Sequence, residues 1–413
     1  MSSPALSHAP TNAASRLPVL MDIGPAVHQR AGLSRYTINL AADLLAHCQD
    51  SVNLAILYNR HSGHTPPQSL AAAPAYPLRM GRYAWRLSAL ASQVFLFPHL
   101  PVNSRLAAFG KAAAATSGHV VYHATEHLLP NVAAPTVLTI HDLIFRRYPQ
   151  HHTLTNRAFL NVAVPLFARR ADAIIAVSRH TKRDLVEQYR VPDEKVHVIY
   201  EGIDESFKPA PQSEQHRVRM QYSPDAPYLL MVGTLEPRKN HAAAFRALAA
   251  LRQSGYPHRL LIVGGDGWLF SPVRQLPATL GLDNQVSFLG YVSHADLLAL
   301  YSAADCFLAP SLYEGFGFPV LEAMACGAPV VCSDASSLPE IAGNAALIVS
   351  PHDDAGLANA IRLVLDQPQF AARLRDLGRQ RSAMFRWDAC AAETVAVYRH
   401  VANLAIASRP PVL

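Results

Sequence analysis

Residues 305–330 read Asp-Cys-Phe-Leu-Ala-Pro-Ser-Leu-Tyr-Glu-Gly-Phe-Gly-Phe-Pro-Val-Leu-Glu-Ala-Met-Ala-Cys-Gly-Ala-Pro-Val and connect an apolar run to a helical pattern. Cys306 to Ala309 is a short apolar run, typical of a buried parallel strand. Pro319 suits the first position of a helix that runs to Ala325 and stops at Gly327. The intervening segment, 310–318, is therefore predicted to be a loop that joins a strand to a helix.

The loop and the first turns of this helix carry two glutamates, Glu314 and Glu322. Gly315 and Gly317 would let the backbone approach a ligand, and the N–H groups at a helix start favour anionic or hydroxyl-rich ligands. Carboxylates accept hydrogen bonds from polyols such as a sugar and a ribose. Taken singly, Glu322 would only complement the helix dipole and Glu314 would be a solvated charge. The whole set favours a ligand site.

The chain of 413 residues is half apolar, which predicts two or three domains. Short apolar strands alternate with helical patterns up to residue 200 and again from residue 228. A break at 201–204 and a polar linker at 208–219 separate the two runs. The pattern predicts an α/β protein with two Rossmann-like, doubly wound domains facing each other. The expected parts are a disordered tail (1–16), an N-terminal domain (17–204), a C-terminal domain (205–384) and a final segment (385–413).

The net charge of +6 lies entirely in the first half of the chain. No acidic residue occurs between Asp50 and Glu126, whereas six basic residues do: Arg60, Arg79, Arg82, Arg86, Arg105 and Lys111. Within the same stretch lie the aromatic residues Tyr83, Trp85, Phe95 and Phe97. One interpretation is a surface that faces anionic lipid. The alternative is an ordinary solvated face with buried aromatics. No nucleic-acid-binding motif accompanies the charge.

Composition excludes several other classes. No run approaches the ~18 apolar residues of a membrane-spanning helix, and the N-terminal tail has neither the basic start nor the apolar core of a signal peptide. Five cysteines occur without a Cys-x-x-Cys pair, which favours a reducing, cytoplasmic compartment. No Asp-x-Asp pair is present, and no metal site is expected.

Further polar residues follow predicted strands in the first half. His141 and Asp142 come directly after the strand 135–140, at the edge where parallel sheets present ligand-binding residues. Asp142 would orient the ring of His141 or cap the next segment. Arg146 and Arg147 would meet an acceptor diphosphate or be solvated. In the second half, Glu340 would reach a donor or serve as a first-turn acid.

The segment Glu-Gly-Phe-Gly-Phe-Pro-Val-Leu-Glu (314–322) resembles the Glu-x7-Glu motif of the retaining glycosyltransferases of family 4, which have the GT-B fold. The flanking Ser-Ala-Ala-Asp (302–305) and Ala-Cys-Gly-Ala-Pro-Val-Val (325–331) extend the resemblance. It implies an acceptor-side N-terminal domain, a nucleotide-sugar-binding C-terminal domain, and a last helix that crosses back to the first domain. The polar segment 123–127 would then face the acceptor, with Glu126 either at the site or solvated.

The resemblance also implies roles for individual residues. His141 would lie over the donor sugar, Glu314 would hold the sugar hydroxyls and Glu322 the ribose. Lys239 matches the family's lysine, and Arg238 would replace an arginine whose usual place is taken by Thr234. The other residues expected around the donor are Gly32, Gly265 in the run 264–268, Val292, Gly315, Phe316 and Gly317. Gly32 stands alone where the family often has a glycine pair.

The implied reaction moves a sugar from a nucleotide diphosphate to an acceptor hydroxyl without an enzyme nucleophile. Arg238, Lys239 and backbone N–H groups would stabilise the leaving diphosphate, with no metal or cofactor. Gly-Thr-Leu-Glu-Pro-Arg-Lys-Asn (233–240) and His-Asp-Leu (141–143) resemble bacterial mannosyltransferases of polysaccharide assembly, which implies GDP-mannose and a lipid-linked glycan at the inner membrane face. The alternatives are another donor such as a UDP-sugar, a sugar-nucleotide epimerase, or a non-catalytic nucleotide-sugar-binding subunit.

Overall fold

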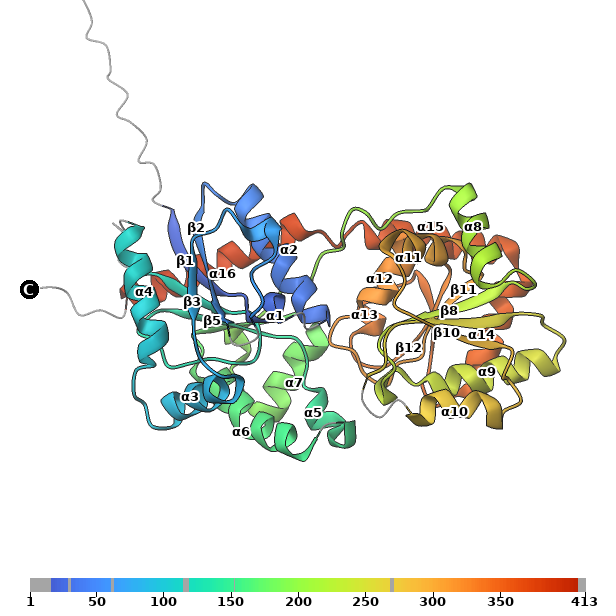
Figure 1. The fold of residues 1–413 in the computed structure, drawn as a ribbon, viewed down its shortest axis with the longest axis horizontal. Helices are drawn as coiled ribbons and strands as arrows, with labels where there is room; N and C mark the ends of the chain where they lie inside the picture. Colours follow the sequence, from blue (N-terminus) through green and yellow to red (C-terminus); the bar gives the residue numbers. More distant parts are fainter. Residues whose placement is uncertain are drawn as a thin grey trace, which may run out of the picture.

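The computed structural model describes residues 16–28, 31–60, 63–113, 119–151, 153–267 and 271–407. The tail predicted over 1–16 therefore lies outside the described residues except for Arg16, and so do Trp268 and residues 408–413. Within the described residues, the chain folds into two α/β domains that lie side by side (Figure 1). The predicted fold of two doubly wound domains is confirmed.

The N-terminal domain contains a parallel sheet of order β3-β2-β1-β4-β5-β6-β7. Its strands are β1 (Leu17–Asp22), β2 (Val52–Asn59), β3 (Ala75–Leu78), β4 (Val121–Ala124), β5 (Thr136–Ile140), β6 (Ala173–Ala176) and β7 (Val196–Val198). Its helices are α1 (Gly24–Val27), α2 (Ala31–His47), α3 (Arg82–Val94), α4 (Leu100–Ala112), α5 (Ile144–Arg147), α6 (Leu154–Arg170) and α7 (Arg179–Tyr189). Short 3-10 turns are η2 (Gln68–Leu70), η3 (Pro149–His151) and η4 (Asp193–Lys195).

The C-terminal domain contains a second parallel sheet, of order β10-β9-β8-β11-β12-β13. Its strands are β8 (Tyr228–Val232), β9 (Arg259–Val263), β10 (Val286–Gly290), β11 (Cys306–Ala309), β12 (Val330–Ser333) and β13 (Ala346–Val349). Its helices are α8 (Gln212–Tyr222), α9 (His241–Gln253), α10 (Ser271–Thr279), α11 (His294–Ala303), α12 (Phe318–Ala325), α13 (Leu338–Ala342), α14 (Asp354–Asp366) and α15 (Pro368–Ser382), with the 3-10 turn η5 (Pro237–Lys239). The last helix of the chain, α16 (Trp387–Ala407), follows them in sequence.

Successive side chains of a strand point to opposite faces of a sheet, and each sheet has an apolar core on both of its faces. In β1, Leu20 packs into one apolar core, whereas Val19 and Met21 pack into the other. In β8, Leu230 and Met231 divide in the same way between the two cores of the C-terminal domain. The carboxyl ends of β5 and β11 lead to His141 and Gly315, which meet across the domain boundary.

The chain crosses between the domains twice, and the two crossings touch. The amide of Ile203 donates to the carbonyl of Phe385 at 3.0 Å. A Cβ on Gly202 would lie only 2.4 Å from the backbone nitrogen of Trp387, so this contact requires glycine. After the second crossing, α16 packs against the core formed by β1 and α2, with Tyr398 fully buried. The last long helix therefore belongs to the N-terminal domain in space.

Two predicted loops are wrong. The polar linker predicted at 208–219 overlaps α8, because Val218 packs into the C-terminal core while the polar side chains cover its outer face. The proline- and alanine-rich composition of residues 64–77 also predicts a loop, but this segment contains η2, and β3 begins within it at Ala75. In addition, α12 begins at Phe318, which places Pro319 at the second helical position instead of the first.

The polar segment expected at 123–127 is also corrected. His123 lies inside β4, between β1 and β5, where every position is buried. Its ring nitrogens bond to the hydroxyl of Tyr398 at 2.7 Å and of Thr139 at 2.8 Å. Burial lowers the pKa of His123 to about 3, so the ring stays neutral. His123 is a structural residue that ties α16 to the sheet.

Candidate functional site

Arg238, Lys239 and Glu314 form one charged cluster at the carboxyl edge of the C-terminal sheet. η5 follows β8 and carries both cations, and Glu314 follows β11, the strand next to β8. Arg238 Nη1 lies 2.5 Å from Glu314 Oε2, and Lys239 Nζ lies 2.7 Å from Glu314 Oε1. The structure thus brings together three of the four residues predicted to be catalytic.

Burial and charge act on this cluster in opposite directions. Burial alone would raise the pKa of Glu314, but Arg238 and Lys239 outweigh it and lower the pKa to about 2. Burial lowers the pKa of Lys239 even though Glu314 opposes the effect. The pKa of Arg238 is raised, because the nearby carboxylates outweigh its burial. At neutral pH Glu314 is therefore fully ionised.

The loop that carries Glu314 is fixed by serine side chains. Ser311 donates to Glu314 Oε1 at 2.8 Å, and Ser336 accepts from the Glu314 amide at 2.7 Å. Ser337 bonds the carbonyls of Glu314 and Phe316 at 2.9 and 2.7 Å. A site whose loop is held this firmly loses little conformational freedom when a ligand binds.

Gly315 lies where the two domains touch. A Cβ at this position would stand 2.4 Å from the carbonyl oxygen of His141 in the other domain. Gly317 has φ +119°, a conformation that L side chains rarely adopt, and it precedes α12. The loop from 310 to 317 therefore brings Gly315 against the backbone of His141. The approach of this loop to a ligand stays a prediction.

His141, the fourth residue predicted to be catalytic, is oriented by Glu201. Its Nδ1 lies 3.1 Å from Glu201 Oε1, and its Nε2 lies 3.0 Å from the carbonyl of Thr125. Burial lowers the pKa of His141, but the hydrogen bond and charge of Glu201 outweigh this, and the pKa is raised. The suggestion that Asp142 orients the ring is wrong, because Asp142 accepts from the Ile144 amide at 3.1 Å and caps that turn.

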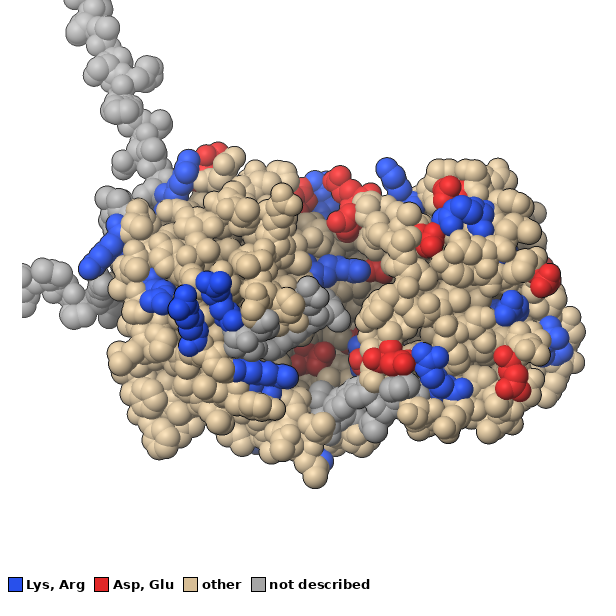
Figure 2. All heavy atoms as spheres, in the orientation of Figure 1, with Lys and Arg blue, Asp and Glu red and all other residues tan. Residues whose placement is uncertain are grey.

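A cavity of about 430 Å³ opens at the carboxyl edge of the N-terminal sheet. Figure 2 shows the molecular surface hollowed between the two domains. The cavity wall combines His141 with two buried carboxylates, Asp22 and Glu126, and with side chains of α3. Glu126 is 6% exposed, so its reading as a solvated charge is wrong. Polar groups of both signs set among aromatic rings are typical of a pocket for a polyhydroxylated ligand.

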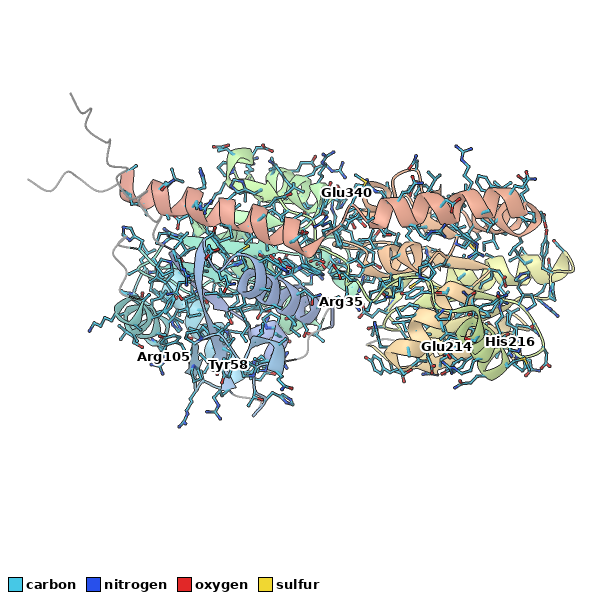
Figure 3. The ribbon with its side chains drawn as sticks, turned by 90° about the horizontal axis from the view of Figure 1, so that it is seen from above. Arg35, Tyr58, Arg105, Glu214, His216 and Glu340 are labelled. Carbon is cyan, nitrogen blue, oxygen red and sulfur yellow. The ribbon has the colours of Figure 1, made fainter. Side chains whose placement is uncertain are left out.

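Glu322 is 2% exposed and already has two partners. Tyr301 donates to its Oε2 at 2.7 Å, and Arg35 of the N-terminal domain pairs with Oε1. The guanidinium of Arg35 also lies 4.9 Å from the ring centroid of Phe318. The predicted ribose contact of Glu322 stays a prediction, and in this structure Arg35 occupies one of its oxygens. Figure 3 places Arg35 at the junction of the domains.

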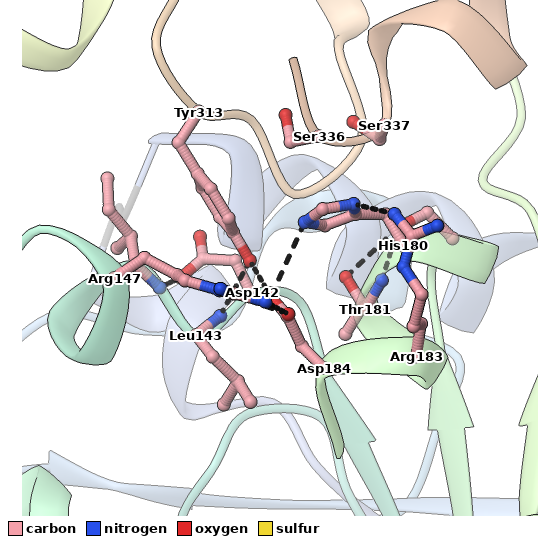
Figure 4. A network of polar contacts seen from close by, with 12 residues as sticks. Asp142, Leu143, Arg147, His180, Thr181, Arg183, Asp184, Tyr313, Ser336 and Ser337 are labelled. Carbon is pink, nitrogen blue, oxygen red and sulfur yellow. Dashed lines mark hydrogen bonds and ion pairs between the residues drawn. The ribbon is translucent and has the colours of Figure 1, made fainter. Parts of the chain in front are cut away.

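A second inter-domain network centres on Asp184, whose side chain is fully buried (Figure 4). Tyr313 of the C-terminal domain donates to Asp184 Oδ2 at 2.9 Å, and Arg147 pairs with Oδ1 at 2.5 Å. Although burial alone would raise it, the pKa of Asp184 is held well below its usual range by His180, Arg147 and Tyr313. Arg147 therefore serves this contact, and its predicted binding of an acceptor diphosphate stays a prediction.

Glu340 makes a third contact between the domains. Its carboxylate accepts from the amides of Arg179 and His180 at 3.1 Å each, and from the hydroxyl of Tyr200 at 3.3 Å. It therefore sits at the start of α7, where a carboxylate is favoured by the N-terminal amides. The predicted role as a first-turn acid is confirmed, because Glu340 lies in the first turn of α13. Its donor contact stays a prediction, and the contact with α7 was not predicted.

The remaining predicted residues surround the C-terminal sheet edge or the inter-domain junction. A Cβ on Gly265 would lie 2.5 Å from the ring of Tyr291, and a Cβ on Gly32 would lie 3.9 Å from Phe318. Phe316 is buried in an apolar cluster between the domains, so its side chain packs there. Thr234 and Val292 are half-buried. Their donor contacts stay predictions.

Sequence reasoning missed Glu201, Tyr313, Asp184 and Arg35. For Glu201 a signal existed, because it follows β7 in the same sheet in which His141 follows β5. The other three act through contacts between domains, which no local pattern reveals.

Comparisons with known proteins agree with this geometry. Residues 30–207 match the model of Glycosyltransferase Family 4, and residues 212–381 match that of Glycosyl transferases group 1. The chain is 30% identical over 283 residues to the O-antigen chain mannosyltransferase B of Escherichia coli, covering 68% of this chain and 74% of that protein. It is 33% identical over 225 residues to the serotype-specific mannosyltransferase WbdA of E. coli, of which it spans only 27%.

Solved structures share the fold. Sucrose-phosphate synthase from Thermosynechococcus elongatus superposes with a TM-score of 0.72 at 24% identity, covering 95% of this chain and 100% of that one. WaaG, a glycosyltransferase involved in lipopolysaccharide biosynthesis, gives a TM-score of 0.64 at 17% identity, covering 92% and 99%. From the matched family models and the E. coli relative, this chain belongs to the family 4 and group 1 glycosyltransferases of GT-B fold.

Proposed function

We propose that this glycosyltransferase moves mannose from GDP-mannose to a hydroxyl of a lipid-linked glycan, with retention of configuration. Two relatives support the sugar: the E. coli O-antigen chain mannosyltransferase B, and the MMP alpha-(1->4)-mannosyltransferase of Mycolicibacterium hassiacum, 33% identical over 236 residues. A polyprenyl diphosphate as the lipid and the cytoplasmic membrane face as the location belong to the same proposal.

The observation that carries the proposal is the cluster of Glu314, Arg238 and Lys239, because Gly315, the residue after Glu314, meets the carbonyl of His141 across the domain boundary. A donor bound beside this cluster would place its diphosphate against the two cations, which stabilise the charge that develops as the sugar leaves. Glu314 would then accept hydrogen bonds from the sugar hydroxyls, and His141, whose ring nitrogens bond Glu201 and the Thr125 carbonyl, would border the sugar. This arrangement suits transfer at the anomeric carbon.

In the proposed step, the bond between the anomeric carbon and the β-phosphate oxygen breaks, and the bond from the acceptor oxygen to the same carbon forms on the same face. The acceptor proton passes to the departing diphosphate, which serves as the base. The protein contributes position and charge without a covalent intermediate, a metal or a cofactor. The buried carboxylates Asp22 and Glu126 would hold acceptor hydroxyls in the cavity beside His141.

The test combines binding and turnover of the purified full chain. A ligand that binds only the folded state raises the melting temperature, so a panel of GDP, UDP, GDP-mannose and UDP-sugars should show the shift only with the guanosine ligands. A shift with uridine ligands alone would refute GDP-mannose. Isomerisation of the free donor would indicate an epimerase, and binding without any turnover would indicate a non-catalytic subunit.

Turnover should require Glu314. We expect Glu314→Gln to lower transfer at least ~100-fold, because it removes the carboxylate that faces the sugar and holds both cations. The matched control is Glu214→Gln, which changes a partly exposed carboxylate on α8 that pairs with Arg217 outside this cluster. NMR of the product's anomeric proton decides between retention and inversion.

A further inference from the structure

Helix α3 carries two apolar stripes on opposite sides, although only one of them packs in the protein. Trp85, Ala89 and Ser92 are buried toward the core. Tyr83 and Leu87 are 74% and 60% exposed. At about 100° per residue, Tyr83 and Leu87 fall on one side of the helix, roughly opposite the buried stripe. The helix therefore has two apolar faces, one packed in the core and one exposed to solvent.

The turn that follows α3 extends this exposed face. Phe95 is 74% exposed, Leu96 58% and Phe97 45%, and Leu100 at the start of α4 is 74% exposed. Leu96 has φ +58°, which is uncommon for a bulky residue. Nearly half of the exposed large apolar side chains among the described residues fall between Tyr83 and Leu100. A concentration of this kind marks an interaction surface.

The alternative of a solvated face with buried aromatics is therefore wrong for three of the four aromatics named above. Trp85 is buried, but Tyr83, Phe95 and Phe97 are exposed. The surrounding charge is uniformly basic, since the chain has no acidic residue from 51 to 125. Arg79 and Lys111 are exposed there, and Figure 2 shows basic side chains over the β3 and α3 side of the N-terminal domain.

The third side of α3 borders the cavity beside His141. Arg82 and Arg86 line that cavity together with Trp85. On the helix they lie between the buried stripe and the exposed one. Arg86 also donates to Asn156 at 2.8 Å, which fixes its direction. One helix thus joins an outward apolar face to a basic edge of the acceptor cavity.

We propose that the exposed face of α3 and the 94–100 turn docks on an anionic lipid bilayer and brings the acceptor cavity to the membrane surface. Aromatic and aliphatic tips would enter the interface while the arginines and lysine meet lipid phosphates. A second copy of the chain would present the same excess of positive charge and be repelled. The docking itself does not depend on the proposed function. The further step, in which docking brings a lipid-linked glycan to the cavity with Arg82 and Arg86 facing its diphosphate, rests on the proposed function.

The test is vesicle co-sedimentation with the full chain. We expect binding to phosphatidylcholine vesicles that contain phosphatidylglycerol to be at least ~tenfold stronger than to phosphatidylcholine alone, and to weaken with salt. The triple variant Leu87→Ser, Phe95→Ser, Leu100→Ser should lose at least ~tenfold in this binding. The matched control, Met220→Ser with Met384→Ser, removes side chains that are 55% and 68% exposed elsewhere and should bind normally.

Several outcomes would overturn the proposal. These are wild-type protein that stays in solution with anionic vesicles, a triple variant that binds as well as wild type, or a wild-type dimer that the triple variant converts to monomer. The triple variant should keep full transfer to a soluble acceptor, because none of its three residues lines the cavity. Loss of vesicle binding with transfer intact therefore separates the docking surface from the proposed activity.

Discussion

Replacing Glu314 by glutamine should remove a pH-dependent part of the protein's stability. Glu314 is 10% exposed and pairs with Arg238 and Lys239. Its pKa is about 2 in the folded protein, against an ordinary value of 4.5. A difference of this size corresponds to about 3 kcal/mol of stability at pH 7. This matches the cost of removing one partner from a buried ion pair, about 3–5 kcal/mol.

The sign of the pH dependence follows from the lowered pKa. The stabilisation is complete above pH ~5, because Glu314 is then ionised in both states, and it declines as the pH falls toward 2. We therefore expect the free-energy difference between wild type and Glu314→Gln to shrink from about 3 kcal/mol at pH 7 to roughly 1 kcal/mol at pH 3.

Urea unfolding followed by circular dichroism at several pH values measures this difference. Glu214→Gln, which alters a partly exposed pair, should leave stability nearly unchanged at every pH. A difference between wild type and Glu314→Gln that is small at pH 7, or that does not vary with pH, would refute the account of Glu314 as a buried anion held by two cations.

Three further changes test other parts of the site. Glu201→Gln should lower the raised pKa of His141, and an imidazole NMR titration that shows no downward movement would contradict their coupling. Gly315→Ala should cut transfer at least ~tenfold and enlarge the radius of gyration in X-ray scattering, because its Cβ would meet the His141 carbonyl. Normal kinetics would count against contact of the two domains at Gly315. Tyr313→Phe should lower the free energy of unfolding in urea by about 1–3 kcal/mol, since buried Asp184 loses a hydrogen bond. Asp184→Asn tests the same contact from the N-terminal domain.

The fold and the charged cluster could be predicted because their signals are local. Apolar strands that alternate with helical patterns predict parallel sheets, and parallel strands end at a common edge. Arg238 and Glu314 follow the strands β8 and β11, so adjacency of those strands was enough to bring them together. The glycine at 315 indicated a close approach to a ligand, whereas the neighbour that the structure shows is the backbone of His141.

The errors arose where tertiary contacts override local pattern. His123 looked like a loop residue because it precedes polar neighbours, yet it lies in a central strand where Tyr398 and Thr139 satisfy both ring nitrogens. The polar composition of 208–219 concealed a helix whose single buried residue, Val218, faces the core. The contacts of Glu322 with Arg35 and of Asp184 with Tyr313 could not be predicted, because each joins residues of different domains.

These inter-domain pairs bear on how the enzyme opens. Arg35 with Glu322, Tyr313 with Asp184, and Glu340 at the start of α7 are all polar contacts. The apolar cluster between the domains is small, and Phe316 is its member nearest to Glu314 in sequence. Polar interfaces can be rehydrated, so relative motion of the domains is the expected behaviour.

Such motion gives Arg35 a specific consequence for donor binding. Arg35 pairs with the carboxylate predicted to hold the donor ribose, so a ribose hydroxyl and the guanidinium compete for the same oxygen. If Glu322 binds the ribose, the donor must displace Arg35, and the energy of that pair is subtracted from donor affinity. Arg35, which joins the two domains, would then tune how readily the spent nucleotide is released.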